Sequence, residues 1–363
     1  EYYPQITRQY ISDRLQGAGQ LEGFGLDSAE YQYKLNQIDP FYSIIQKNHY
    51  QIEYFNRDWF AWYEILREAN FSSKSKKLRV LLIDNIEAIS AVKHYYHHVS
   101  DLNWYSNVAN EKYKDHLLSP TEINIKMIQQ FFSKDPVDLY LGYGSHGSQE
   151  NLRQLLAGLV SLREGGTMIL RTFDILSDFA ASLMVQMQML FGEVKIVKPL
   201  GSPAQSAEVF LIGSGYRSKE FATYSVVLMN YFDDHSDSSS GELLNKLPNM
   251  VVTPEMDGEL IYTAYKIYIL NMIPMLQIIS DLMNNSKYKL NNIQETEYQM
   301  LLNKKQSAQN LVKLDPTQIA EVTKVDSQID ELFKEVNQNI QHDFKWLIDE
   351  ISTSWEAQNP LKK

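Results

Sequence analysis

The strongest constraint on the fold is an alternation of short apolar runs with longer amphipathic segments. Apolar runs suited to strands occur at 76–84, 137–141, 167–172, 194–197 and 209–212, and the first is typical of a strand buried on both faces of a parallel sheet. Helices are expected between them, at 86–96, 121–133, 149–162 and 177–191. Strands that alternate with helices of this length predict an α/β fold with a doubly wound, Rossmann-like sheet.

Regions of different character flank this core. Residues 1–50 are rich in Tyr, Gln and Gly without sustained periodicity, and residues 51–70 are expected to form a buried helix. An acidic, Ser-rich loop at 232–241 precedes helices expected at 261–282, 294–311 and 326–351. We therefore predict three parts, which are an irregular N-terminal arm with short helices at 1–50, an α/β domain at 51–220 and an all-helical extension at 221–363.

The composition excludes several classes of site. The chain has no cysteine, which removes disulfides, thiolate metal sites and cysteine nucleophiles. Its net charge of -11 disfavours a surface that is basic overall, so RNA contact would require a local patch. One short basic run precedes the first strand, at Lys74, Lys76, Lys77 and Arg79. Such runs are usually solvated, so bulk RNA binding is not expected.

No membrane segment is expected. The most apolar long stretch, residues 261–280, contains polar residues that a lipid-spanning helix would bury only at considerable cost, namely Lys266, Asn271, Pro274 and Gln277. We interpret it as a buried helix of a soluble protein. The start at Glu1 shows no basic region followed by an apolar one, so no signal peptide is expected either.

Three motifs in the middle of the chain carry a resemblance to a known family. They are VDLYLGYG at 137–144, EGGTMILRTFD at 164–174, and the segment from Lys198-Pro199 to AEVFLIG at 207–213. Their order of strand, helix, Gly-Gly turn, strand, helix, strand resembles the second half of an FtsJ-type (RrmJ-type) RNA ribose 2'-O-methyltransferase. The mRNA cap 2'-O-methyltransferases, including those of large DNA viruses, look most similar. The resemblance covers residues 51–216 and is strongest at 137–213.

The resemblance implies a catalytic tetrad of Lys, Asp, Lys and Glu, most of which is exchanged here. The aspartate position falls on Tyr143 and the central lysine position on Arg171, while Glu208 keeps the fourth position. The first lysine belongs on the helix before the first strand, where Ala61 is the best placement. An arginine stays protonated and cannot accept a hydroxyl proton, and a tyrosine has no carboxylate. The resemblance therefore implies the family's fold with degenerate catalytic positions.

The implied cofactor turn is also altered. In the family, a glycine-rich turn after the first strand lies against S-adenosylmethionine, whereas Asp84, Asn85 and Glu87 occupy that turn here. Side chains would fill the space that glycines leave open, and Glu87 adds a negative charge. We therefore expect no bound cofactor, and S-adenosylmethionine only if the site is active.

Other patterns have simpler interpretations. Arg171 and Glu208 can form a structural ion pair in place of a catalytic one. Three histidines at helical spacing, His94, His97 and His98, lack a suitably placed carboxylate, so no metal site is expected.

Three functional hypotheses follow from these observations. The leading one is a catalytically degenerate methyltransferase that serves as a structural or regulatory subunit of a viral mRNA-processing or transcription assembly. Its protein partners would bind the C-terminal helices, and it would reside in the host cytoplasm or the virion. The second is an active cap ribose 2'-O-methyltransferase that uses Lys195 or Lys198 as the base, oriented by Glu208. The third is a module that binds capped RNA by stacking a base on Trp59, Trp62 or Trp104.

Overall fold

The computed structural model describes residues 6–22, 29–47, 52–71, 76–108, 111–118, 124–145, 147–236, 244, 246–309 and 316–358. By their internal contacts these residues divide into two compact units, one containing residues 1–15 and 48–273 and the other containing residues 16–47 and 274–363. The boundaries of these units differ from those of the predicted ranges 1–50, 51–220 and 221–363. The division of the chain into those three domains stays a prediction.

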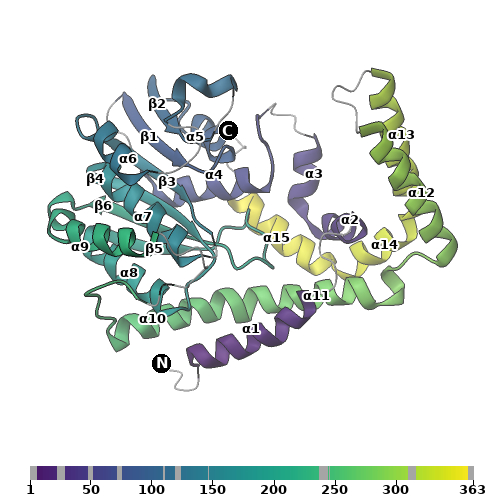
Figure 1. Ribbon diagram of the computed structural model, residues 1–363. Helices are drawn as coiled ribbons and strands as arrows, with labels where there is room; N and C mark the ends of the chain where they lie inside the picture. Colours follow the sequence, from purple (N-terminus) through teal and green to yellow (C-terminus); the bar gives the residue numbers. More distant parts are fainter. Residues whose placement is uncertain are drawn as a thin grey trace. The chain divides into compact units, whose positions relative to one another are not determined.

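The first unit is built on a six-stranded sheet with strand order β2-β1-β3-β4-β6-β5 (Figure 1). Its strands are β1 (Lys77–Ile83), β2 (Asp101–Ser106), β3 (Val137–Tyr143), β4 (Leu162–Thr172), β5 (Phe191–Val197) and β6 (Val209–Tyr216). The first four in spatial order are parallel, and β6 pairs antiparallel with both β4 and β5. The chain leaves β1 towards β2 and returns to β3 on the other side of β1. The gap between β1 and β3 is therefore the topological switch point, where α/β sheets commonly bind ligands at the carboxyl ends of the strands.

Helices cover both faces of this sheet. One face carries α6 (Ile125–Phe132), α7 (Ser148–Ser161), α8 (Asp178–Leu190) and α9 (Ser218–Ser236), and the other carries α4 (Arg57–Ala69) and α5 (Glu87–Tyr95) (Figure 1). Leucines of α7, including Leu152 and Leu156, share a buried core with strand residues such as Leu81, Met168 and Leu211. On the opposite face the Trp62 and Phe210 rings meet edge to face, 5.0 Å apart. The predicted doubly wound α/β fold is thus confirmed.

Local capping explains where several helices begin. The side chain of Asn124 accepts a hydrogen bond from the backbone of Met127 ahead of α6, and Ser177 does the same for Ala180 at the start of α8. Thr253 caps α10 (Pro254–Ala264), whose first-turn proline supplies no backbone donor and needs none there. The first unit also contains the start of α1 (Arg8–Glu22) and the short helix η1 (Glu111–His116).

A long apolar helix continues from α10 through the π-helical segment η2 (Tyr265–Met272) into α11 (Ile273–Asn284). By length and composition alone, residues 254–284 are apolar enough to cross a membrane, but 44% of the most apolar window is buried in the protein. Buried helices of globular proteins have the same properties. The expected absence of membrane contact therefore stays a prediction.

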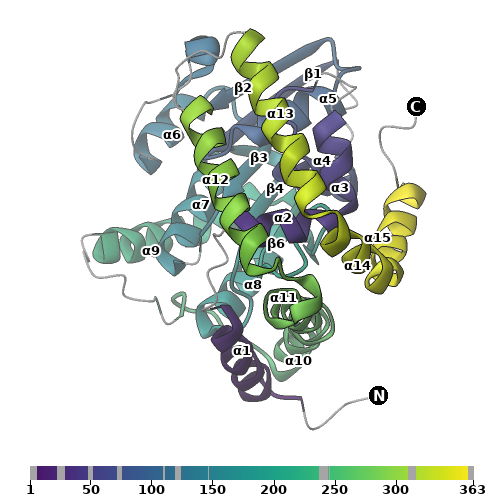
Figure 2. The same ribbon diagram turned by 90° about the vertical axis from the view of Figure 1, so that its right-hand side faces the viewer.

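The second unit is helical in all of its described residues. It contains α2 (Ala29–Ile38), α3 (Pro40–Lys47), most of α11, η3 (Ser286–Tyr288), α12 (Asn292–Gln309), α13 (Pro316–Leu332), α14 (Lys334–Asp343) and α15 (Lys345–Gln358). Helices α12 and α13 lie side by side as a hairpin (Figure 2). Ion pairs join them, from Lys305 to Asp326 at 2.6 Å and from Lys304 to Glu321 at 3.6 Å.

Several expected elements were wrong in detail. Within residues 1–50 the expected short helices are present as α1, α2 and α3, but they carry buried side chains, including Ile11 and Phe41. Residues 232–236 belong to α9 rather than to a loop, while residues 237–241 of that loop lie outside the described residues. The Gly165-Gly166 turn is part of β4, with Gly165 at a positive φ of 75°. The helix expected at 326–351 is interrupted at Phe333 and Phe344.

Candidate functional site

The strand registers bring the predicted tetrad positions to one edge of the sheet. Tyr143 at the end of β3 is the register partner of Arg171 near the end of β4. Arg171 is in turn the partner of Phe210 on the antiparallel strand β6. Glu208 immediately precedes β6, so its carboxylate reaches the carboxyl end of β4. The adjacency therefore follows from sheet topology.

Arg171 and Glu208 form a buried ion pair. The Nε atom of Arg171 lies 2.5 Å from Oε1 of Glu208, and the two side chains are only 8% and 3% exposed. The contact is not aligned as a hydrogen bond, and Nη1 of Arg171 has no acceptor among the described residues. Aromatic rings approach the guanidinium carbon, with the centre of Tyr143 at 3.8 Å and that of Phe173 at 4.7 Å. Cation–π contacts and the carboxylate thus offset the cost of burying this charge.

A lysine and a serine extend this pair. Ser202 donates a hydrogen bond to Oε2 of Glu208 at 2.6 Å and accepts one from Nζ of Lys198 at 2.9 Å. The same Nζ donates to the carbonyl oxygens of Pro203 at 3.0 Å and Ser206 at 2.8 Å. We call Arg171, Lys198, Ser202 and Glu208 the ion-pair cluster. All three protons of the Lys198 ammonium have acceptors, one in the cluster and two on the backbone of the adjoining loop.

Burial lowers the pKa of Lys198 to about 7, because desolvation disfavours the charged amine. The Glu208 carboxylate opposes this shift, whereas the positive charges of Arg57 and Arg171 add to it. The three hydrogen bonds of the ammonium also favour its charged form. Lys198 is therefore an amine whose neutral form is accessible near neutral pH, held in a hydrogen-bonded cage.

Helix α4 closes the cluster from one side. A Cβ on Gly201 would lie 2.5 Å from the backbone nitrogen of Ala61, so only glycine lets the loop approach the helix this closely. One turn after Ala61, Glu64 accepts a hydrogen bond from the Gly201 backbone at 3.2 Å. Burial raises the pKa of Glu64, and these backbone hydrogen bonds partly oppose the rise. Ala61, the best placement of the first lysine, thus lies against the loop that carries Ser202.

The turn after β1 is filled by its own hydrogen bonds. Asp84 adopts a left-handed conformation, with a φ of 59°. Its backbone nitrogen donates to Asn107 at 2.8 Å, and its carboxylate accepts from Asn107 at 2.6 Å and from Gln154 at 3.0 Å. Asn85 is 1% exposed and its Oδ1 accepts a hydrogen bond at 2.7 Å from the backbone nitrogen of Ala88 in the first turn of α5, while its own Nδ2 has no partner among the described residues.

Gln154 joins this turn to the switch point. Its Oε1 accepts a hydrogen bond from the buried hydroxyl of Tyr140 at 2.7 Å, and its Nε2 also donates to Glu150 at 2.9 Å. Burial raises the pKa of Tyr140 well above its usual value, and the charges of Asp84 and Glu150 raise it further. We call Asp84, Asn107, Tyr140, Glu150 and Gln154 the amide cluster.

These contacts leave a poor fit for S-adenosylmethionine. A Cβ on Gly142 would lie 2.9 Å from Oε1 of Gln154, and one on Gly144 would overlap Asn151. Side chains of α7 therefore already occupy the space beside the end of β3. The oxygens of Asp84 are engaged, and Glu87 lies in the first turn of α5. A glycine-lined cradle of the expected kind is absent from this described turn.

The structure places the predicted residues in two groups. Tyr143, Arg171 and Glu208 lie together, with Ala61 behind the adjoining loop, whereas Asp84, Asn85 and Glu87 lie at the turn after β1. Their catalytic and cofactor roles stay predictions. Sequence reasoning missed Ser202, Glu64, Asn107 and Gln154. The Gly201-Ser202 step after Lys198-Pro199 was the one local signal that pointed to a tight loop at this place.

Base stacking on the predicted tryptophans is contradicted by their burial. Trp59, Trp62 and Trp104 are 0%, 1% and 5% exposed. Trp104 already stacks on the His116 ring at 3.9 Å. These rings are part of the core, so they cannot receive a base without local unfolding.

The basic run before β1 does not offer a free cation at Arg79. Its guanidinium pairs with Asp135 at 3.1 Å and donates to the Tyr105 hydroxyl at 3.3 Å. Among the described residues no group of three or more acidic or histidine side chains could hold a metal ion. The prediction that His94, His97 and His98 hold no metal stays a prediction.

Comparison with known proteins gives a family match. The model of the FtsJ-like methyltransferase family matches residues 9–216. Two relatives are probable methyltransferases EP424R of African swine fever virus, from a Kenyan pig isolate and a Namibian warthog isolate. Each is 25% identical over 233 residues, which cover 49% of this chain and 54% of the relative. The chain thus spans about half the length of the curated relatives it matches.

Two solved structures are weakly similar. A fibrillarin/Nop5p complex gives a TM-score of 0.31 at 15% identity and covers 44% of this chain and 84% of that chain. An rRNA methylase from Streptococcus thermophilus gives a TM-score of 0.27 at 10% identity, and the match covers 44% of this chain and 94% of that chain. Similarities at this level carry no weight for function.

Proposed function

Because the chain belongs to the FtsJ-like methyltransferase family, we propose that it is a catalytically degenerate member of that family. It would act as a structural or regulatory subunit of an mRNA-processing or transcription assembly. The observation that carries the proposal is the buried pair of Arg171 and Glu208, with Tyr143 over the guanidinium. A protonated guanidinium cannot remove a proton from a ribose hydroxyl, and the carboxylate is already engaged by Arg171 and Ser202.

The altered turn after β1 supports the same proposal independently. Asp84 is held by Asn107 and Gln154, and α7 side chains fill the end of β3. Methyl transfer needs both a base and room for the methyl donor. Departures at two separate places that serve one reaction are better explained by loss of the reaction than by migration of a single role.

Methyl transfer from radiolabelled S-adenosylmethionine to capped RNA tests the proposal. We expect no transfer by the wild-type protein and no binding of S-adenosylmethionine in calorimetry. A variant with the family's residues at the exchanged positions, Ala61→Lys, Tyr143→Asp and Arg171→Lys, is the matched comparison. Transfer by the wild type that is lost in Glu208→Gln would show the proposal to be wrong.

The second candidate is an active cap ribose 2'-O-methyltransferase in which Lys198 is the base. The pKa of about 7 and the link through Ser202 to Glu208 favour it. The bound cofactor would supply the methyl group, and Lys198 would accept the proton at Nζ after releasing one of its acceptors. Under this candidate Lys198→Met abolishes transfer. The control Lys195→Met does not, because Lys195 is exposed and pairs with Glu193 at 3.3 Å.

A role as a subunit is supported by apolar side chains exposed on the helical unit. Ile293, Met300, Ile319 and Trp346 are 81%, 61%, 53% and 58% exposed. Exposed apolar residues of this size are common at sites of protein association. We propose that these C-terminal helices bind protein subunits and that, as the relatives are viral, the assembly works in the host cytoplasm or the virion. Chemical crosslinking followed by identification of the subunits that copurify would test this role.

A further inference from the structure

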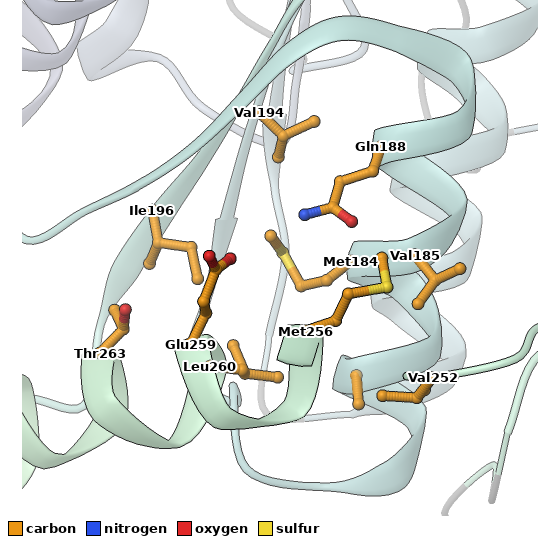
Figure 3. Close-up of a pocket in the computed structure, with 11 residues that line it drawn as sticks. Met184, Val185, Gln188, Val194, Ile196, Val252, Met256, Glu259, Leu260 and Thr263 are labelled. Carbon is orange, nitrogen blue, oxygen red and sulfur yellow. The ribbon is translucent and has the colours of Figure 1, made fainter. Parts of the chain in front are cut away.

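A small cavity lies beside the edge strand β5 in the first unit (Figure 3). Its volume is about 170 Å³. Apolar side chains from three elements line most of it, including Met184 of α8, Val194 and Ile196 of β5, and Met256 and Leu260 of α10. This volume suits one aliphatic or thioether side chain rather than a cofactor, because drug-sized ligands need several hundred Å³.

The position of the strand determines how such a side chain could arrive. β5 is the last strand in the sheet order, so among the described residues its outer edge has no strand neighbour. Val194 and Ile196 alternate along β5 and line the cavity, whereas Glu193 and Lys195 point to the other face and pair with each other. A segment added at this edge would lie about 4.8 Å from β5 and direct every second side chain towards the cavity.

The negative charge of Glu259 at the rim of the cavity indicates a second feature of a segment that could bind there. Glu259 of α10 projects beside the cavity next to Ile196, and it is exposed (Figure 3). Among the described residues no cation pairs with it, and no lining residue is basic. The neighbouring Gln188 is neutral and exposed. A lysine or arginine two residues from the apolar anchor would lie on the same face, about 6.7 Å away.

We propose that the β5 edge binds an extended segment of a partner protein with the pattern apolar–any–Lys/Arg. The segment adds to the sheet as a seventh strand, its apolar side chain fills the cavity, and its basic side chain pairs with Glu259. Backbone hydrogen bonds supply much of the affinity and the two side chains supply specificity, as in other strand-addition complexes. This site requires neither S-adenosylmethionine nor the ion-pair cluster. Its test can therefore succeed or fail independently of the test of the proposed function.

The probe is the peptide Thr-Val-Thr-Met-Thr-Lys-Thr-Val-Thr-amide with fluorescein attached at its N-terminus, and its binding to the whole chain is followed by fluorescence anisotropy. We expect saturable binding together with slower hydrogen exchange at the amides of β5. Met→Ala in the peptide should weaken binding by about tenfold, because the anchor then leaves the cavity empty. N-methylation of alternate peptide amides should abolish binding, because it removes the donors that pair with the strand.

A charge swap provides the matched control on the protein. Glu259→Lys should weaken the binding of the lysine peptide by about fivefold. It should strengthen the binding of a peptide with glutamate in place of that lysine by a similar factor. Because Glu259 is exposed, this variant is expected to fold normally. Ala181→Leu fills the cavity. It should therefore reduce the difference in affinity between peptides with Met and with Ala at the anchor position.

Three results would overturn the proposal. One is the absence of binding up to about 1 mM for peptides with Met, Leu or Val at the anchor position, since that limit is only about 4 kcal/mol of affinity. Another is equal binding of the N-methylated peptide, which would indicate a helical or irregular mode. The third is insensitivity to the charge swap, which would remove Glu259 from the site.

Discussion

The two clusters at the carboxyl edge of the sheet are held together by different interactions. In the ion-pair cluster, buried charges remain: Arg171 and Glu208 pair below 10% exposure, and Lys198 lies behind them. In the amide cluster, Gln154 bridges a buried phenol and the more exposed Asp84. The ion-pair cluster is held by buried opposite charges. The amide cluster fills a turn with hydrogen bonds that two amides make to a phenol and to carboxylates.

This difference has an energetic consequence. Charges buried together depend on each other, because removing one leaves the other without compensation in a medium of low polarity. The buried hydrogen bond between the neutral groups of Tyr140 and Gln154 contributes less, and its loss costs mainly the desolvation of one unsatisfied group. We therefore expect single substitutions in the ion-pair cluster to destabilise the fold more than those in the amide cluster.

The largest effect is expected from Glu208→Ala. It leaves the Arg171 guanidinium buried with only the aromatic contacts, and we expect a loss of about 3–5 kcal/mol in the free energy of unfolding. The double variant Arg171→Met with Glu208→Leu removes both charges and should recover most of that loss. Urea unfolding measures both.

The exposed pair of Lys345 and Asp349 is the matched control for that experiment. Its side chains are 70% and 58% exposed, so removing Asp349 should change stability by less than about 1 kcal/mol. An equally small effect at Glu208 would mean that the buried pair contributes no more than a surface one.

The next effect concerns Lys198 and pH. Its folded pKa of about 7 lies below the value of a free lysine, so above pH 7 the unfolded chain binds more protons than the folded one. Stability should therefore rise with pH from about 7 to 10, by at most about 1.4 kcal/mol per pH unit. The lysine opposes folding most at and below pH 7, where both states are protonated.

Lys198→Met should remove this rise, because methionine has a similar shape and does not titrate. The measurement is the difference in unfolding free energy between wild type and variant from pH 6 to about 9.5, in which other titrating groups cancel. Parallel curves for the two proteins would show that Lys198 stays charged in the folded state, which would also weaken the second functional candidate.

A smaller loss is expected in the amide cluster. Gln154→Leu leaves the buried Tyr140 hydroxyl without its acceptor, at a cost of about 1–3 kcal/mol. Adding Tyr140→Phe removes the stranded hydroxyl as well, so the double variant should be more stable than Gln154→Leu alone. Thermal unfolding of the two proteins compares them directly. A double variant less stable than the single one would contradict the assigned hydrogen bond.

The difference between β1 and β2 shows which strands could be predicted from the sequence. The apolar run that forms β1 is readable because both of its faces are covered. β2 went unnoticed because it is an edge strand, where Asp101 and Asn103 interrupt the apolar pattern. The interruption at Phe333 of the helix expected at 326–351 could not be predicted from the sequence for another reason. That fully buried ring packs against Tyr33 and Tyr298, which belong to distant parts of the chain.

The candidate site shows the same division. Arg171, Tyr143 and Glu208 could be placed because they lie in, or directly before, strands with a recognisable motif order. Gln154 and Ser202 could not, because a polar residue on a helix or loop shows its role only when the partner from another element is known. Tyr140 is that partner for Gln154, and Glu208 is that partner for Ser202.

The smallest effect is expected at the turn itself, where backbone and side chain oppose each other. Asp84 has a φ of 59°, a conformation in which a glycine avoids about 1 kcal/mol of strain. Asp84→Gly loses the contacts to Asn107 and Gln154, which are worth a similar amount because Asp84 is exposed. Its stability should therefore stay within about 1 kcal/mol of the wild type. Asp84→Val loses the same contacts and strains the backbone further, so chemical denaturation should find it clearly less stable than Asp84→Gly. Equal stability of the two variants would mean that the contacts of Asp84, and not its backbone conformation, decide the stability of this turn.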